Sequence, residues 1–154
     1  MCEVETKLDG ETARVTLKGV IDEQTSLEKL IGRKMKTLHV YSRGVTRINS
    51  PGVKDWRTFF ERARGDGIQI KFWETAPPLV DQMNFFPDFI KLTEVESICT
   101  PHFCETCSHV TLKNFSLSEL ILVKNALPII PCEKCKGPTE FDELDVNYFA
   151  FLND

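Results

Sequence analysis

The chain has 154 residues, 42% of them hydrophobic and 27% charged, and a net charge of −4, which suits one packed domain, or one domain with a small appendage, and excludes wholesale disorder. No uncharged stretch is longer than 8 residues and the acidic start lacks the apolar core of a signal peptide, so we exclude a membrane-spanning helix and expect a cytoplasmic protein with no membrane partner. In that compartment the six cysteines favour metal binding or reactive thiols over disulfides.

The N-terminal third predicts strands. Val4–Leu8 and Thr12–Val20 alternate apolar and polar residues, and Asp9-Gly10 between them is typical of a tight hairpin turn. Ser26–Ile31 predicts a short helix, and Thr37–Tyr41 predicts a central strand.

The next segment predicts a long helix followed by a strand. Ser50 is a capping residue, and Pro51 after it suits the first helical turn. Gly65 and Gly67 mark the end of the helix, and Ile68–Trp73 alternates as a strand. We expect one core between the sheet and its helices, made of Val15, Leu17, Leu38, Val40, Trp56, Phe60, Ile68, Ile70 and Phe72.

Beyond this, Pro77-Pro78 opens a short helix that Pro87 stops, and Thr93–Cys99 predicts a further strand. The alternation of strands and helices indicates an α/β fold, a mixed β-sheet with helices packed on it. A proline-rich segment starts near Thr100, so we expect a first domain over residues 1–99 and a small second domain over residues 100–154.

The second segment carries a metal-site pattern. Cys104 and Cys107 form one C-x2-C pair and Cys132 and Cys135 form another, with 24 residues between the two pairs. Two such pairs supply four thiolates to one tetrahedral ion, which favours Zn²⁺, with iron of the same geometry as the alternative. Four protein ligands leave no open position, so the site is predicted to be structural. His102 and His109 flank the first pair and are expected at the surface or behind the ligands; Cys99 is expected to be a small buried residue.

Two resemblances follow from these motifs. The strand ending Gly19-Val-Ile-Asp22, and the run Leu38–Val53 with Tyr41-Ser-Arg-Gly-Val45 and Asn49-Ser-Pro-Gly-Val53, resemble the STAS superfamily of bacterial anti-sigma-factor antagonists over residues 3–98. The four cysteines resemble a rubredoxin-type zinc ribbon. The combination looks like small bacterial proteins that join a STAS-like domain to such a ribbon.

The STAS resemblance implies a partner-binding surface on the loop 42–52 and the helix that follows. In antagonists the serine directly before the glycine at the helix start is phosphorylated, but Pro51 stands there, so we expect binding without the usual phospho-switch. Ser50, one residue earlier, is the remaining candidate for phosphorylation, and its simpler predicted role is the helix N-cap.

Charge distribution favours a protein partner. Residues 32–72 carry 10 Lys and Arg against 3 Asp and Glu, and the predicted binding residues there, which suit an acidic partner, are Arg43, Arg47, Ser50, Lys54 and Arg57. We therefore expect a non-catalytic, regulatory protein–protein interaction module in bacterial signalling, with a homodimer as another candidate assembly. The alternatives are a nucleotide-binding STAS-like sensor, or a nucleic-acid-associated zinc ribbon, which the acidic residues 104–154 disfavour. The histidines and carboxylates form no recognisable nucleophile–base pair, so no enzyme activity is expected.

Overall fold

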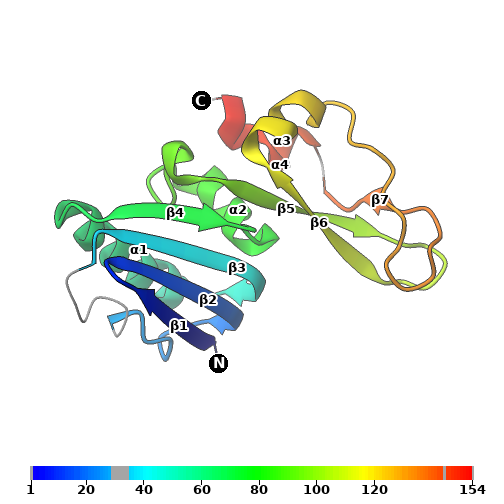
Figure 1. Ribbon diagram of the computed structural model, residues 1–154. Helices are drawn as coiled ribbons and strands as arrows, with labels where there is room; N and C mark the ends of the chain where they lie inside the picture. The colour runs from blue at the N-terminus through cyan, green and yellow to red at the C-terminus, as the bar shows by residue number, and fades with distance from the viewer. Residues whose placement is uncertain (1, 29–34, 144, 154) are drawn as a thin grey trace.

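The computed structural model describes residues 2–28, 35–143 and 145–153 (Figure 1). These residues form a mixed α/β fold with two sheets, which confirms the fold class predicted from the strand and helix patterns. No helix among the described residues is long and apolar enough to cross a membrane.

The first sheet contains the strands β1 (Glu3–Asp9), β2 (Thr12–Ile21), β3 (Thr37–Ile48) and β4 (Gln69–Trp73), in the order β1-β2-β3-β4. β1 runs antiparallel to β2, whereas β2, β3 and β4 run parallel. Gly10 turns the chain between β1 and β2 with a φ of 61°, a conformation that glycine adopts without strain. The predicted hairpin and central strand are therefore confirmed.

Two helices, α1 (Ser50–Gly65) and α2 (Pro77–Phe85), lie behind the first sheet in the view of Figure 1. The nine predicted core residues are all buried and belong to one hydrophobic cluster. Trp56 and Phe60 of α1 pack on each other with ring centroids 4.5 Å apart, and both rings contact Phe72 of β4. The period of the helix and the alternation of the strands thus converge on the same core.

The prediction of a loop at residues 42–52 is wrong for residues 42–48, which belong to a strand. β3 continues to Ile48, and its pairing with β2 continues through two shifts of register. Ser42 and Val45 are buried in this extension, so the strand is held by packing as well as by the parallel ladder. The predicted cap is also wrong: Asn49 is the N-cap of α1, and its side chain accepts a hydrogen bond from the Gly52 amide at 2.8 Å.

The second sheet contains β5 (Ser97–Phe103), β6 (Val110–Ser116) and β7 (Glu140–Phe141), in the order β6-β5-β7, with antiparallel pairing. The strand predicted at Thr93–Cys99 starts later, because a short 3-10 helix, η2 (Leu92–Glu94), precedes it. β5 runs without a break across the predicted domain division between residues 99 and 100.

The C-terminal half shares the core of the first sheet. Short helices follow β6 and β7: α3 (Leu117–Val123), α4 (Asp145–Tyr148) and η3 (Ala150–Asn153). Leu120, Tyr148 and Phe149 belong to the same hydrophobic cluster as Trp56 and Phe60. The helix predicted at Ser26–Ile31 falls partly on residues 29–34, which lie outside the described residues, and Ser26 and Leu27 are not helical.

Candidate functional site

The four predicted cysteine ligands meet at one point. The sulfur atoms of Cys104, Cys107, Cys132 and Cys135 all lie within 4.8 Å of one another. Cys104 Sγ is 3.4 Å from Cys135 Sγ, and Cys107 Sγ is 3.6 Å from Cys132 Sγ. A tetrahedral ion with bonds of about 2.3 Å to sulfur separates its ligands by about 3.8 Å. The spacing therefore fits one metal ion bound by four thiolates.

The two pairs are built as matching turns. In the first, the Ser108 amide donates to the carbonyl of Cys104 at 2.8 Å; in the second, the Lys136 amide donates to the carbonyl of Cys132 at 2.9 Å. Ser108 and Lys136 have positive φ values of 62° and 65°, so in both turns the backbone changes direction directly after the second cysteine. This shared backbone geometry directs both sulfurs of a pair to the same side.

Antiparallel backbone pairing flanks each of the two cysteine turns. The first turn connects β5 to β6, with Phe103 paired to Val110 just before it. The second turn lies between α3 and β7 and is flanked by a bridge between Pro131 and Pro138. In Figure 1 both turns lie at the far end of the second sheet, away from β1 to β4. The site therefore ties a distal loop to the tip of the β5–β6 hairpin.

Backbone amides favour thiolates at this site. The Cys107 amide lowers the pKa of Cys104, and the amides of Cys135 and Lys134 lower the pKa of Cys132 to about 6. The pKa of Cys107 is raised to about 12, although the His109 amide lowers it, because desolvation and hydrogen bonds to the other three sulfurs favour its thiol. Four thiolates this close repel one another, so they do not all ionise readily on their own; a bound divalent cation offsets this repulsion.

The flanking histidines have different surroundings. His109 is half-buried, and its Nε2 lies 2.5 Å from the carboxylate of Glu133, which joins the first turn to the second behind the cysteines. His102 is buried, which excludes the surface position among the two expected for it. Its Nε2 shares a hydrogen bond of 2.7 Å with Thr100, and burial lowers its pKa. Cys99 is buried as predicted, and burial raises its pKa to about 12, which makes it unreactive.

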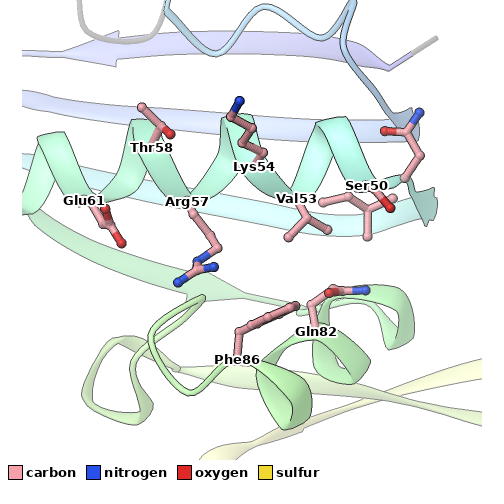
Figure 2. A pocket seen from close by; sticks show the side chains of 10 residues that line it. Ser50, Val53, Lys54, Arg57, Thr58, Glu61, Gln82 and Phe86 are labelled. Carbon is pink, nitrogen blue, oxygen red and sulfur yellow. The ribbon is translucent and has the colours of Figure 1, made fainter.

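A second candidate site is a groove of about 440 Å³ between α1 and α2 (Figure 2). Its walls are Ile48, Asn49, Ser50, Val53, Lys54, Arg57, Thr58, Glu61, Gln82 and Phe86. The Arg57 guanidinium lies 5.0 Å from the centre of the Phe86 ring and donates to Asp88 at 2.7 Å. No acidic residue lies in the first turn of α1 to offset its positive end. Beside this end, however, the Glu23 carboxylate accepts from the Asn49 side chain at 3.1 Å, so the groove is mixed in polarity and in charge.

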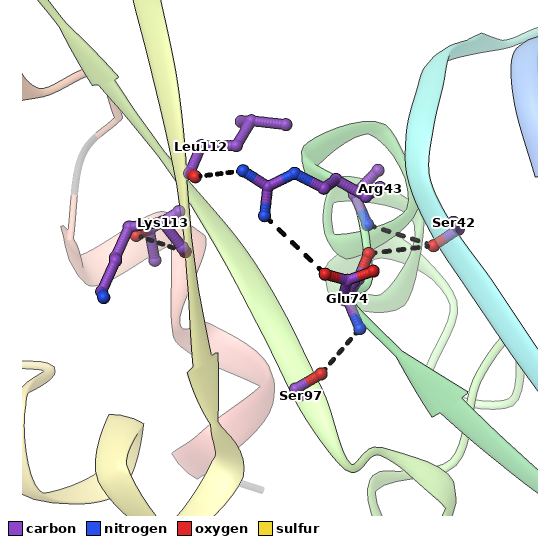
Figure 3. Close-up of polar contacts among 8 residues, drawn as sticks. Ser42, Arg43, Glu74, Ser97, Leu112 and Lys113 are labelled. Carbon is purple, nitrogen blue, oxygen red and sulfur yellow. Dashed lines mark hydrogen bonds and ion pairs between the residues drawn. The ribbon is translucent and has the colours of Figure 1, made fainter. Parts of the chain in front are cut away.

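The structure divides the predicted binding residues. Ser50, Lys54 and Arg57 line the groove, whereas Arg47 is exposed on β3 outside the set that lines it. Arg43 takes part in an internal contact: its Nη2 donates to the carbonyl of Leu112 at 2.7 Å, and its Nη1 lies 3.8 Å from Glu74 (Figure 3). Arg43 therefore joins the two sheets.

Several residues of these sites carried no signal in the sequence. Gln82 of α2 and Phe86, the residue that caps its C-terminus, both line the groove, whereas the sequence predicts only that a short helix lies there. Gly137 lies against the second turn, where a Cβ would meet Cys135 Sγ at 3.4 Å.

Comparison with known proteins identifies no family for this chain. No protein-family model matches the chain, and no curated protein matches it.

Proposed function

We propose that this protein is a non-catalytic interaction module that binds a segment of a partner protein in the groove between α1 and α2. The observation that supports this most is the groove itself, which brings Ser50, Lys54 and Arg57 together beside an exposed aromatic ring, Phe86. Three lining residues, Ile48, Val53 and Phe86, are apolar and the other seven are polar or charged, so the groove suits a segment that has both kinds of side chain. The four-cysteine site has no open ligand position through which catalysis would run.

The partner segment is acidic and carries an apolar anchor. Lys54 and the N-terminal end of α1 attract a carboxylate, while Val53 and Phe86 offer apolar surface to a neighbouring side chain. Arg57 already has Asp88 as a carboxylate partner, so it orients rather than neutralises the incoming group. The resemblance to STAS antagonists suggests a regulatory partner in bacterial signalling in the cytoplasm.

The switch of that family is not part of the proposal. Pro51 replaces the serine that antagonists phosphorylate and sits in the first turn of α1. Ser50 is exposed at the mouth of the groove, and a phosphate there would compete with an acidic partner for Lys54. We propose constitutive binding, with phosphorylation of Ser50 as its competitor.

The metal is proposed to be Zn²⁺ with a structural role. Four cysteine ligands at single-ion spacing suit zinc, and the first cysteine of each pair is buried while the second is exposed. Without the ion, three contacts would mainly hold the loop that carries Cys132 and Cys135. They are the β-bridge between Pro131 and Pro138, the hydrogen bond from the Glu133 amide to the Thr111 hydroxyl, and the contact between His109 and Glu133. The metal would therefore supply folding energy that this small segment lacks.

A nucleotide is the second candidate ligand, because the groove volume falls in the range of small-molecule sites and the cationic groups suit a phosphate. Glu61 also lines the groove, and its carboxylate would repel the phosphate of a nucleotide, which disfavours this candidate.

The test is site-directed photo-crosslinking in the native host, with the reactive group in place of Thr58, followed by purification of the captured protein and measurement of its affinity. We expect an acidic contact segment and an affinity that falls with salt and with Lys54→Glu, but not with Lys113→Glu on β6. If the affinity of the captured protein changed neither with salt concentration nor with Lys54→Glu, the proposal would be contradicted. Calorimetry with purine nucleotides in place of the protein tests the second candidate.

A further inference from the structure

The first sheet ends in an open edge at β1. β1 pairs with β2 along its whole length, from Glu3 opposite Lys18 to Asp9 opposite Thr12, and no strand of the described residues pairs with its other side. The opposite edge of this sheet is different, because bridges from Phe72 to Val95 and from Thr75 to Ile98 continue it toward the second sheet. Among the described strands of the first sheet, β1 is therefore the one with a free backbone edge.

The side chains of β1 divide between the two faces of the sheet. Val4, Thr6 and Leu8 lie opposite Leu17, Val15 and Ala13, which are all buried, so they are on the face that carries the helices. Glu3, Glu5, Lys7 and Asp9 are on the other face. Leu8 is on the core side and is still 51% exposed, which leaves apolar surface uncovered at the edge.

We propose that β1 pairs antiparallel with β1 of a second copy, around a two-fold axis perpendicular to the sheet that passes beside Thr6. Such an axis joins residues whose side chains point to the same face. The pairing uses all seven residues of the strand. Glu5 then faces Lys7 of the second copy, and Val4 faces Leu8, each pair occurring twice. Opposite charges and apolar pairs across strands both stabilise a sheet.

The neighbouring symmetric registers are worse. Moving the axis one residue toward the N-terminus pairs Glu3 with Lys7 but places Glu5 opposite Glu5 at the centre of the ladder. Moving it one residue the other way places Lys7 opposite Lys7 and Glu5 opposite Asp9. Either shift also leaves two residues at an end of the strand unpaired. In the proposed register the like-charged pair is Glu3 with Asp9, at the exposed ends of the ladder, where water and salt screen the repulsion.

The dimer leaves the proposed functional sites free. It joins two four-stranded sheets edge to edge, whereas α1 and α2 lie on the face behind, and the cysteine turns lie at the far end of the second sheet (Figure 1). One strand pair buries little area, so we expect a weak, concentration-dependent dimer rather than an obligate one. The inference does not depend on the groove, and either can fail alone.

Sedimentation velocity over a wide range of protein concentration tests the dimer with two charge reversals. Glu5→Lys places a lysine opposite Lys7 of the second copy, and Lys7→Glu places a glutamate opposite Glu5, so each variant alone should be monomeric. An equimolar mixture of the two variants restores both opposite-charge pairs and should sediment as a dimer. Lys113→Glu on β6 is the control, since it makes the same charge change as Lys7→Glu on the second sheet and should keep the dimer.

Circular dichroism establishes that each variant is folded. A wild-type protein that is monomeric at every concentration overturns the proposal. Single variants that still dimerise, or a mixture that stays monomeric, overturn it too, because the pairing of Glu5 with Lys7 would then not hold the copies together.

Discussion

Arg43 on β3 donates a hydrogen bond to the backbone carbonyl of Leu112 on β6, with 2.7 Å between Nη2 and the oxygen. The two residues are 69 positions apart and belong to different sheets (Figure 3). The same junction contains Ser42, whose Oγ accepts from the Ala76 amide at 3.2 Å, and Ser97, whose Oγ accepts from the Glu74 amide at 2.6 Å. Polar contacts between residues distant in sequence thus orient the second sheet on the first.

Arg43→Ala should lower the free energy of unfolding by about 1 kcal/mol, because one charge-assisted hydrogen bond to a partly exposed group is lost. Arg47→Ala, four residues along the same strand, is the control and should change it by less than about 0.5 kcal/mol. Urea unfolding followed by fluorescence measures both. Equal losses in the two variants would mean that the Leu112 contact is not what makes Arg43 matter.

The start of α1 gives a second prediction. Asn49→Ala removes the side chain that accepts from the Gly52 amide and should cost about 0.5–2 kcal/mol. Ser50→Ala leaves that bond intact and should cost less than about 0.5 kcal/mol. Thermal unfolding of the pair decides between the two caps, and a larger loss for Ser50→Ala would restore the cap predicted from sequence.

Phe60→Ala tests the orientation of α1 on the sheet. Phe60 is fully buried between Trp56, Phe59 and Phe72, so its truncation should cost about 3–5 kcal/mol. Thr58→Ala on the exposed side should be nearly neutral. If urea unfolding gave a loss below about 1 kcal/mol for Phe60→Ala, the helix would present a different face to the sheet.

The sequence was sufficient where one periodic pattern determines an element. Alternation identified β2 and β4, and the 3.6-residue period placed Trp56 and Phe60 in the core. The C-x2-C spacing identified the cysteine site, because the turn that brings two sulfurs together is local.

The errors arose where tertiary pairing decides the structure. Residues 42–48 contain Ser, Arg, Gly and Thr, which suit a loop, but the parallel ladder with β2 extends β3 through them. Asn49 and Ser50 are equally good capping residues by type, and only the backbone shows which one precedes the first turn. The groove joins α1 to α2, whose packing no local pattern encodes.

A fourth prediction concerns Asp81, on the wall of a pocket of about 410 Å³ between α2 and α4 that also contains Glu143. Desolvation of its carboxyl raises the pKa of Asp81, and desolvation and then repulsion by Asp81 raise the pKa of Glu143. Both residues are nevertheless exposed to solvent, so water screens much of this effect. The small remaining contribution favours the folded state when the two groups are protonated, and it is lost as pH rises through the raised pKa values.

Asp81→Asn should accordingly raise the free energy of unfolding slightly at neutral pH, and the gain should shrink as pH falls toward the ordinary carboxyl pKa of 3.8. Urea unfolding across this pH range measures the difference between the two proteins. Glu140→Gln on β7 is the control, since this exposed carboxylate lies outside both sites and its replacement should give no such gain. A stabilisation that is equal at all pH values would contradict the assignment.

Native mass spectrometry of protein purified without chelators tests whether Cys104, Cys107, Cys132 and Cys135 hold one structural zinc ion. We expect a folded mass that exceeds the denatured mass by one zinc ion less the protons it displaces. Cys132→Ser should lose that ion and expose residues 104–140 to protease, whereas Cys99→Ser should keep it. Metal-free wild-type protein with a protease-resistant C-terminal half, or zinc that persists in Cys132→Ser, would show that the four cysteines do not form a structural zinc site.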